Sequence, residues 1–237
     1  MQERQQIEIC LIATNKYTIF VVPLIESIKR FFLIRHSIEI TLFTDNISLE
    51  CFEDERVSIV KELIPSYRFP EATLMRYHIM TSKEYKCDYI YYLDIDYLIV
   101  SEIDEEIFGN IVAVLHPGFS MVGGGSWCND KRSNAYTYPE NREQYFCGGT
   151  QGGRYEYYYP IMKRLKREIE DDEQNFVRAE WNDEGHWNKL LSELKSFKIL
   201  DSRYCMVQSH QLQIIWKINH FIPKIIALDK DHKTIRE

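Results

Sequence analysis

Two acidic residues, Asp94 and Asp96, lie between two apolar runs of the chain. The run at 88–93 is rich in tyrosine, and a second apolar run follows at 97–100. This pattern is typical of a strand that is buried on both faces and carries acids at its carboxyl end. Ligands bind at that edge in open α/β sheets, and an Asp-x-Asp pair there can place two carboxylate oxygens on one divalent cation.

Two interpretations of this acidic pair follow from the residues alone. The first is a solvated turn between two strands. The second is a metal site, because acids flanked by apolar residues are costly to bury without a cation or hydrogen bonds. Mn²⁺ and Mg²⁺ suit such oxygen ligands, and they usually keep water and substrate phosphates as their remaining ligands.

The composition bounds the class of protein. The chain of 237 residues is 45% hydrophobic and carries a net charge of −7, so a globular fold is expected and nucleic acid is not an expected partner. Six cysteines without C-x-x-C spacing indicate free thiols rather than a zinc site. No run of about 18 apolar residues is present, so no membrane span is expected, and the missing leader predicts a cytoplasmic protein. The oligomeric state stays open.

The elements that must position the acids can be read from the apolar periodicity. Strands are expected at 7–13, 38–43, 57–63, 88–93 and 111–115, and helices near 18–33, 71–84, 158–169 and 187–194. Strand, helix and strand in this order predict a parallel α/β sheet in one domain. Residues 120–154 combine glycines with aromatic residues and predict a long ligand-lining loop. The charged tail at 229–237 has the composition of a frayed terminus.

Six motifs occur in an order that resembles the family 6 glycosyltransferases, which include the histo-blood-group A and B transferases. The resemblance runs from about residue 7 to residue 236. The motifs are Ala-Thr-x-Lys-Tyr at 13–17, Phe-Thr-Asp at 43–45, Asp-Ile-Asp at 94–96, Leu-His-Pro-Gly-Phe at 115–119, Tyr-Phe-x-Gly-Gly-x-x-Gly-Gly at 145–153 and Trp-Asn-Asp-Glu-x-His-x-Asn-Lys at 181–189.

The resemblance implies a GT-A fold, which is a single Rossmann-like α/β sandwich with a mixed, mainly parallel central sheet. Residues 1–237 would form one domain, with a nucleotide- and metal-binding half at about 1–115 and an acceptor-binding half at about 116–237. The implied reaction is a retaining α1,3-transfer of N-acetylgalactosamine or galactose. The donor is the UDP-sugar, and the acceptor is the 3-hydroxyl of a terminal β-galactoside, with or without fucose.

The resemblance also assigns residues to the donor site. It implies that Asp94 and Asp96 hold Mn²⁺ or Mg²⁺ at the diphosphate, and that the charged tail is a lid rather than a frayed end. The implied donor- and nucleotide-binding residues are Ala13, Thr14, Tyr17, Asp94, Ile95, Asp96, Gly148, Gly149, Lys230 and Arg236.

The implied catalytic residues are Glu184, Asp183 and Arg132. Glu184 matches a glutamate beneath the donor anomeric carbon, Asp183 matches a residue that holds donor hydroxyls, and Arg132 resembles an arginine near both. The neighbour Asn182 replaces the usual histidine. Two routes to retention stay open, with the glutamate either as a nucleophile or as a group that stabilises an oxocarbenium-like state during same-face attack.

Acceptor contact is implied for His116, Trp181 and Cys147. The pocket at 147–149 is expected to distinguish donors, and Gly149 and Gly118 fit a roomier pocket that favours UDP-N-acetylgalactosamine over UDP-galactose. Cys147 and Gln151 depart from the family pattern. The alternatives are galactose as the donor sugar, a non-catalytic sugar- or nucleotide-binding relative, and a hydrolase of nucleotide sugars.

Overall fold

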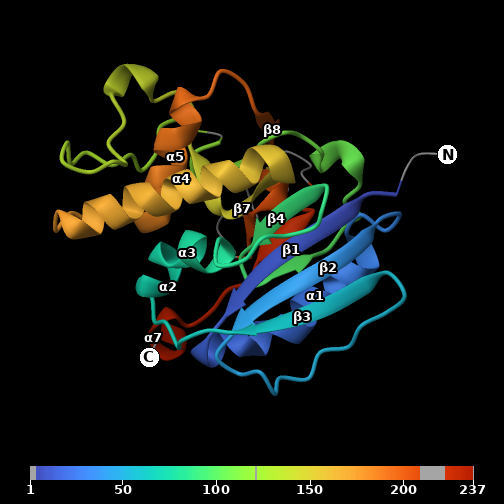
Figure 1. The fold of residues 1–237 in the computed structure, drawn as a ribbon. Helices are drawn as coiled ribbons and strands as arrows, with labels where there is room; N and C mark the ends of the chain where they lie inside the picture. The colour runs from blue at the N-terminus through green and yellow to red at the C-terminus, as the bar shows by residue number, and fades with distance from the viewer. Residues whose placement is uncertain (1–3, 121, 209–221, 237) are drawn as a thin grey trace.

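The fold is built on a central sheet of seven strands, in the order β3–β2–β1–β4–β7–β6–β8 (Figure 1). The computed structural model describes residues 4–120, 122–208 and 222–236. Strands β3, β2, β1 and β4 are parallel, β7 is antiparallel to both β4 and β6, and β8 is parallel to β6. The predicted α/β fold with a mixed, mainly parallel sheet is confirmed. The strands are β1 Gln6–Ala13, β2 Ser37–Thr44, β3 Val57–Leu63, β4 Tyr89–Leu93, β6 Val112–Leu115, β7 Phe146–Arg154 and β8 Lys198–Leu200.

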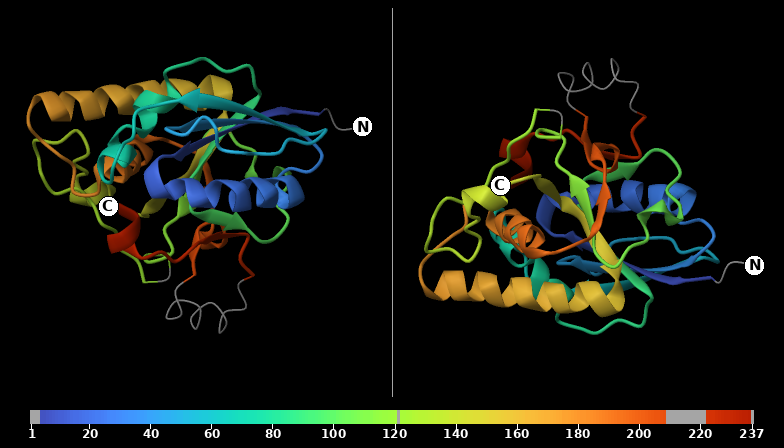
Figure 2. Two further views of the ribbon diagram at one scale, coloured as in Figure 1. Left: turned by 90° about the horizontal axis from the view of Figure 1, so that it is seen from below. Right: turned by 90° about the horizontal axis from the view of Figure 1, so that it is seen from above.

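Helices cover both faces of this sheet, which explains why β1 is apolar on both sides. Side chains along a strand alternate between faces. Ile9 and Leu11 belong to the core cluster that contains α1, whereas Cys10 and Ile12 belong to the cluster that contains α4 and α5. Figure 2 shows α1 and α4 on opposite sides of the sheet. The helices are α1 Val21–Phe31, α2 Glu71–Leu74, α3 Arg76–Met80, α4 Tyr155–Gln174, α5 Asn182–Glu193 and α7 His232–Arg236.

The order of the strands creates a crevice between β1 and β4. The chain leaves β1 toward β2 and β3 on one side and returns to β4 on the other side. At such a switch point the connections diverge from the carboxyl ends of the two strands and leave room for a ligand. Thr14 follows β1 and Asp94 follows β4, so both lie at this crevice.

The expectation of one loop over 120–154 is wrong for its last quarter, because 146–154 form β7 in the middle of the sheet. Glycine weakens a strand in isolation, and it marks places where neighbours approach closely. A Cβ on Gly152 would lie 2.3 Å from Cδ1 of Tyr91, and Gly153 has a φ of +148° against the carbonyl of Asn110. Tertiary contacts, rather than local preference, therefore select the strand.

A second, three-stranded sheet places the end of the chain beside Asp96, because β10 pairs with β5 directly after this residue. It has the order β5–β10–β9, with β5 Tyr97–Ile99, β10 Ile225–Ala227 and β9 Met206–Val207. Short 3₁₀ helices lie at η1 Asn15–Phe20, η2 Glu105–Ile107, η3 Pro139–Asn141 and η4 Ser202–Tyr204. The helix expected at 71–84 is two short helices that end at Met80. Within the described ranges, no helix has both the length and the apolar character needed to cross a membrane.

Candidate active site

A pocket lies at the carboxyl ends of β1 and β4, where the strand order opens the crevice. It is lined by side chains from η1, α2, β4 and the end of the chain. Of the residues expected in the donor site, the pocket brings together Thr14, Tyr17, Asp94, Ile95, Asp96 and Lys230. Ala13 lies beneath them in the core and is fully buried.

Asp94 is held at the end of β4 by contacts that leave part of its carboxyl group open. Its Oδ1 accepts a hydrogen bond from Tyr92 Oη at 2.8 Å and lies 3.3 Å from Nη2 of Arg76. Its backbone N–H donates to the carbonyl of Gly149 at 2.8 Å, which ties β4 to β7. The side chain remains 34% exposed toward the pocket, so Oδ2 can take a further ligand.

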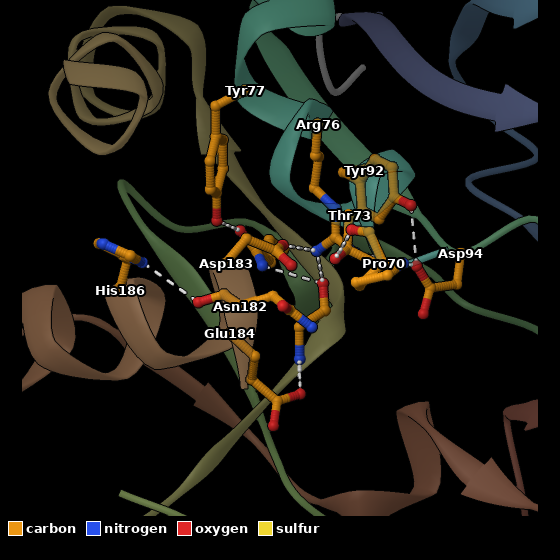
Figure 3. A network of polar contacts seen from close by, with 12 residues as sticks. Pro70, Thr73, Arg76, Tyr77, Tyr92, Asp94, Asn182, Asp183, Glu184 and His186 are labelled. Carbon is orange, nitrogen blue, oxygen red and sulfur yellow. Dashed lines mark hydrogen bonds and ion pairs between the residues drawn. The ribbon is translucent and has the colours of Figure 1, made fainter. Parts of the chain in front are cut away.

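Arg76 is the site residue that the sequence interpretation missed. It is 4% exposed, yet its guanidinium contacts Asp94, Asp183 Oδ2 at 2.9 Å and the carbonyl of Gly148 at 2.5 Å (Figure 3). Burial alone would lower the pKa of Arg76, but the charges of Asp183 and Asp94 raise it well above its usual value. A cation between Met75 and Tyr77, in a segment that also holds Leu74, Ile79 and Met80, was the available signal, because a buried charge requires partners.

Asp183 carries an oxygen that lacks a directed hydrogen bond. The side chain is 3% exposed, and its Oδ2 is ion-paired with Arg76 but has no hydrogen-bond partner among the described residues. Burial, with the charge of Asp94 adding to it, raises the pKa of Asp183 against the opposing effect of Arg76. A buried oxygen whose one partner is this ion pair can accept a further hydrogen bond, such as one from a ligand hydroxyl.

Glu184 lies one residue further along α5 and faces β7. Its Oε2 accepts the backbone N–H of Gly148 at 2.7 Å. Burial, together with the charge of Asp183, raises the pKa of Glu184 to about 7, although the Gly148 hydrogen bond opposes the shift. Both protonation states are therefore populated near neutral pH. Both acids lie in the first turn of α5, where the exposed backbone amides favour carboxylates.

The expected acceptor residues come from three elements: His116 from the end of β6, Trp181 from the start of α5 and Cys147 from β7. His116 follows β6, its Nδ1 accepts the N–H of Gly118 at 3.1 Å, and its ring lies 4.9 Å from that of Phe119. Burial lowers the pKa of His116 to about 4, so the ring is neutral. Trp181 immediately precedes α5 and is 54% exposed. Cys147, in contrast, is buried in the core cluster that includes Tyr97.

The space beside Gly149, which was expected to accommodate the larger donor sugar, is filled by protein side chains. A Cβ at this position would lie 2.1 Å from Tyr97 Oη and 2.5 Å from Asp94 Oδ2. The glycine therefore allows Tyr97 and Asp94 to lie close to the backbone of β7. The steric argument for the larger donor sugar loses its basis at this residue.

Arg132 is the expected catalytic residue that the structure does not bring to the acids. Its side chain is 73% exposed, and its guanidinium is ion-paired with Asp130, only two residues away, at 2.6 Å. This near partner satisfies the arginine on the loop surface. Arg76 occupies the place beside Asp183 that the resemblance implied for Arg132.

The charged tail folds over the pocket instead of fraying. Lys230 is ion-paired with Asp96, and its ammonium lies 5.3 Å from the centre of the Tyr17 ring. Lys16 Nζ donates to the carbonyl of Thr234 at 2.8 Å, and Ile235 lines the pocket. Arg236 belongs to α7, but its side chain lies outside the described residues.

The residues at the pocket fit a divalent cation of the Mg²⁺ or Mn²⁺ type. Asp94 and Asp96 supply carboxylate oxygens to the same pocket, which leaves the remaining positions to water and phosphate, as these ions prefer. The described part of the chain has one other candidate group, His36 with Asp104 and Glu105. It lies at the amino end of β2, on the opposite edge of the sheet. Arg35 is ion-paired with both of its acids.

Comparison with known proteins agrees with this geometry. The profile described as Glycosyltransferase family 6 matches residues 1–237. Histo-blood group ABO system transferase 1 of Rattus norvegicus is 24% identical over 240 residues, which cover 97% of this chain and 68% of the relative. Globoside alpha-1,3-N-acetylgalactosaminyltransferase 1 of Homo sapiens is 26% identical over 240 residues, with the same coverage of 97% and 68%. The Gallus gallus protein of that name is 26% identical over 210 residues, covering 81% of this chain and 59% of the relative. The chain belongs to glycosyltransferase family 6 and is a hexosyltransferase.

Proposed function

We propose that the protein is a retaining α1,3-glycosyltransferase that uses Mn²⁺ or Mg²⁺. It moves N-acetylgalactosamine from UDP-N-acetylgalactosamine to the 3-hydroxyl of a terminal β-galactoside, with or without fucose. The observation that carries this proposal is the continuous line of contacts from Asp94 through Arg76 to Asp183 in the turn that also bears Glu184. It links the acids of a diphosphate and metal site to the acids of a sugar site.

The nucleotide would occupy the amino-terminal side of the pocket. Thr14 and Tyr17 offer a hydroxyl and an aromatic face, and Thr14 Oγ1 is fixed by the carbonyl of Tyr67 at 2.9 Å. Asp94 and Asp96 would hold the ion, which when bound acts as a Lewis acid that stabilises negative charge on the leaving UDP. Lys230 brings a second cation from the tail to the same end of the pocket.

The sugar would extend from the diphosphate toward α5. There Asp183 Oδ2 would accept a donor hydroxyl, and Glu184 would lie beneath the reacting carbon. His116 and Trp181 would then contact the acceptor from the outer side. Glu184 has two routes to retention, as a nucleophile or as a charge that stabilises the transition state during same-face attack.

The donor sugar is the finer part of the proposal. Support for N-acetylgalactosamine comes from the relatives named as globoside α1,3-N-acetylgalactosaminyltransferases. UDP-galactose is the alternative, because Tyr97 fills the space beside Gly149 and residue 149 no longer separates the two donors.

We expect the double variant Asp94→Asn, Asp96→Asn to lose metal-stimulated transfer. Amides keep the shape but bind Mn²⁺ and Mg²⁺ far more weakly than carboxylates, so its rate should match that of the wild type in chelator. The matched control is Asp104→Asn, Glu105→Gln, which alters the second acidic group and should keep the metal response. A wild-type rate that chelator leaves unchanged would remove the metal from the proposal.

Replacing Lys230 by methionine should weaken the binding of UDP by about tenfold, because one charge-assisted contact to the diphosphate is lost. Uridine, which has no phosphate, should bind both proteins equally in calorimetric titrations. Lys233→Met, an exposed change in α7, is the control and should bind UDP normally. Equal losses for uridine and UDP would show that Lys230 shapes the pocket and does not contact phosphate.

A further inference from the structure

Asp183 and Glu184 lie in the first turn of α5, and the residue that begins this helix has an unusual backbone conformation. Asn182 has a φ of +51° and immediately precedes Asp183 and Glu184. Few residues other than glycine adopt this left-handed conformation, although asparagine tolerates it better than most. A residue of this kind persists where its surroundings hold it in place.

The carbonyl of Asn182 is held by His186. His186 is 1% exposed, and its Nδ1 lies 3.1 Å from the Asn182 oxygen (Figure 3). Its Nε2 lies 3.1 Å from Oδ2 of Asp172 in the last turns of α4. The ring therefore bridges the start of α5 and the last turns of α4 through its two nitrogens.

Asp172 is an anchored partner for the His186 ring. Ser133 Oγ and the N–H of Asn134 donate to its two oxygens at 2.5 and 2.7 Å, so the loop around 133 is fixed to the same carboxylate. Burial alone would raise the pKa of Asp172, but the hydrogen bonds from His186, Asn134 and Ser133 outweigh it and lower the pKa. The carboxylate therefore stays charged and connects α4, α5 and the loop.

We propose that His186, held by Asp172, is a positioning residue for sugar transfer that acts through the backbone of Asn182. The side chains of His186 and Asp172 do not line the pocket. The Asp183–Arg76 contact of 2.9 Å and the Glu184–Gly148 hydrogen bond of 2.7 Å both depend on where this turn begins. A displacement of about 1 Å in a reacting group can cost about 100-fold in rate, so a small loss of support here is amplified in the reaction.

The test is His186→Gln, because one glutamine amide can donate to the carbonyl or to Asp172 but cannot reproduce both bonds. The assay is made well below the melting temperature of the variant. We expect kcat to fall by about 10- to 100-fold, while the Kd for UDP stays within about twofold. Backbone amides of 181–186 should also exchange hydrogen at least about tenfold faster than in the wild type, with β1 and β4 unchanged.

His36→Gln is the matched control. His36 is also buried, at 2% exposed, and its Nε2 contacts Glu105 Oε1 at 3.2 Å on the far edge of the sheet. This variant should lower the melting temperature, and its kcat should stay at the wild-type value. Unchanged kcat in His186→Gln, or a parallel loss of kcat and UDP affinity in it, would overturn the inference.

A second variant, Asp172→Asn, and the hydrogen-exchange measurement each test the inference separately. If His186→Gln does not fold, Asp172→Asn is judged by the same criteria, since it removes the charge but keeps an oxygen for Asn134. The kinetic test rests on the proposed function for its substrates, whereas the hydrogen-exchange test does not. If the wild type transfers neither sugar, the substrate proposal fails, and exchange at 181–186 alone then decides the positioning inference.

Discussion

Replacing Glu184 by glutamine should lower the rate of sugar transfer by about 1000-fold, or ~4 kcal/mol in activation free energy. Glutamine has the same shape, and its carbonyl oxygen can still accept the N–H of Gly148, so the turn should keep its position. What disappears is the negative charge that the proposal places beneath the reacting carbon, which both routes to retention require. The affinity for UDP should stay within about threefold, because Glu184 does not line the pocket proposed for the nucleotide.

Two measurements make this prediction specific. In the wild type, kcat should rise as the pH rises through about 7, because the pKa of Glu184 is about 7 and the ionised form is the active one. Glu180→Gln, an exposed change that keeps a contact to Asn129, should behave as the wild type. If Glu184→Gln transfers sugar normally, the carboxylate has no catalytic role, and if it loses UDP affinity instead, the residue is structural.

Replacing Arg76 by methionine should have the largest effect on the free energy of unfolding. The change leaves Asp183 buried without its cation, and the loss of one partner from a buried ion pair typically costs about 3–5 kcal/mol. Transfer should also fall by orders of magnitude, because Asp94 and Asp183 lose the group that joins them. Chemical denaturation and initial-rate measurements would separate the two effects.

A double-mutant cycle shows whether loss of the Arg76–Asp183 ion pair causes the loss of stability. Removing both charges, as in Arg76→Met with Asp183→Asn, should recover part of the lost stability, because no unpaired charge remains buried. Arg132→Met is the control from the exposed pair with Asp130 and should change neither stability nor transfer. Strictly additive effects in the cycle, or a loss of transfer in Arg132→Met equal to that in Arg76→Met, would contradict the site described here.

Apolar periodicity predicted the strands that carry the end of the site at Asp94. The runs that became β1, β2, β4 and β6 are buried on both faces, and that pattern is visible in a single sequence. The acids of the Asp-x-Asp pair lie at a carboxyl end, as their place in the run indicated. Strand β7 was missed because Gly152 and Gly153 are selected by Tyr91 and Asn110, which are distant in sequence.

The same limit explains what was missed within the site. Arg76 joins residues 94, 148 and 183, and such a set of contacts leaves no local pattern beyond a charge among apolar neighbours. Gly149 was expected to leave room, because composition does not reveal that Tyr97 fills that space. The tail looked like a solvated end by composition, and only the resemblance indicated that it folds back.

The most direct measurement is the release of UDP from UDP-N-acetylgalactosamine and from UDP-galactose, each with and without Mn²⁺ and a fucosylated galactoside. Release that depends on Mn²⁺ and rises when the galactoside is added is the result we predict, with UDP-N-acetylgalactosamine as the faster donor. Faster release from UDP-galactose would reverse the donor assignment and leave the reaction intact. Release that the galactoside does not stimulate, with free sugar as the product, would indicate a hydrolase. Absence of release from either donor would contradict the proposed transfer.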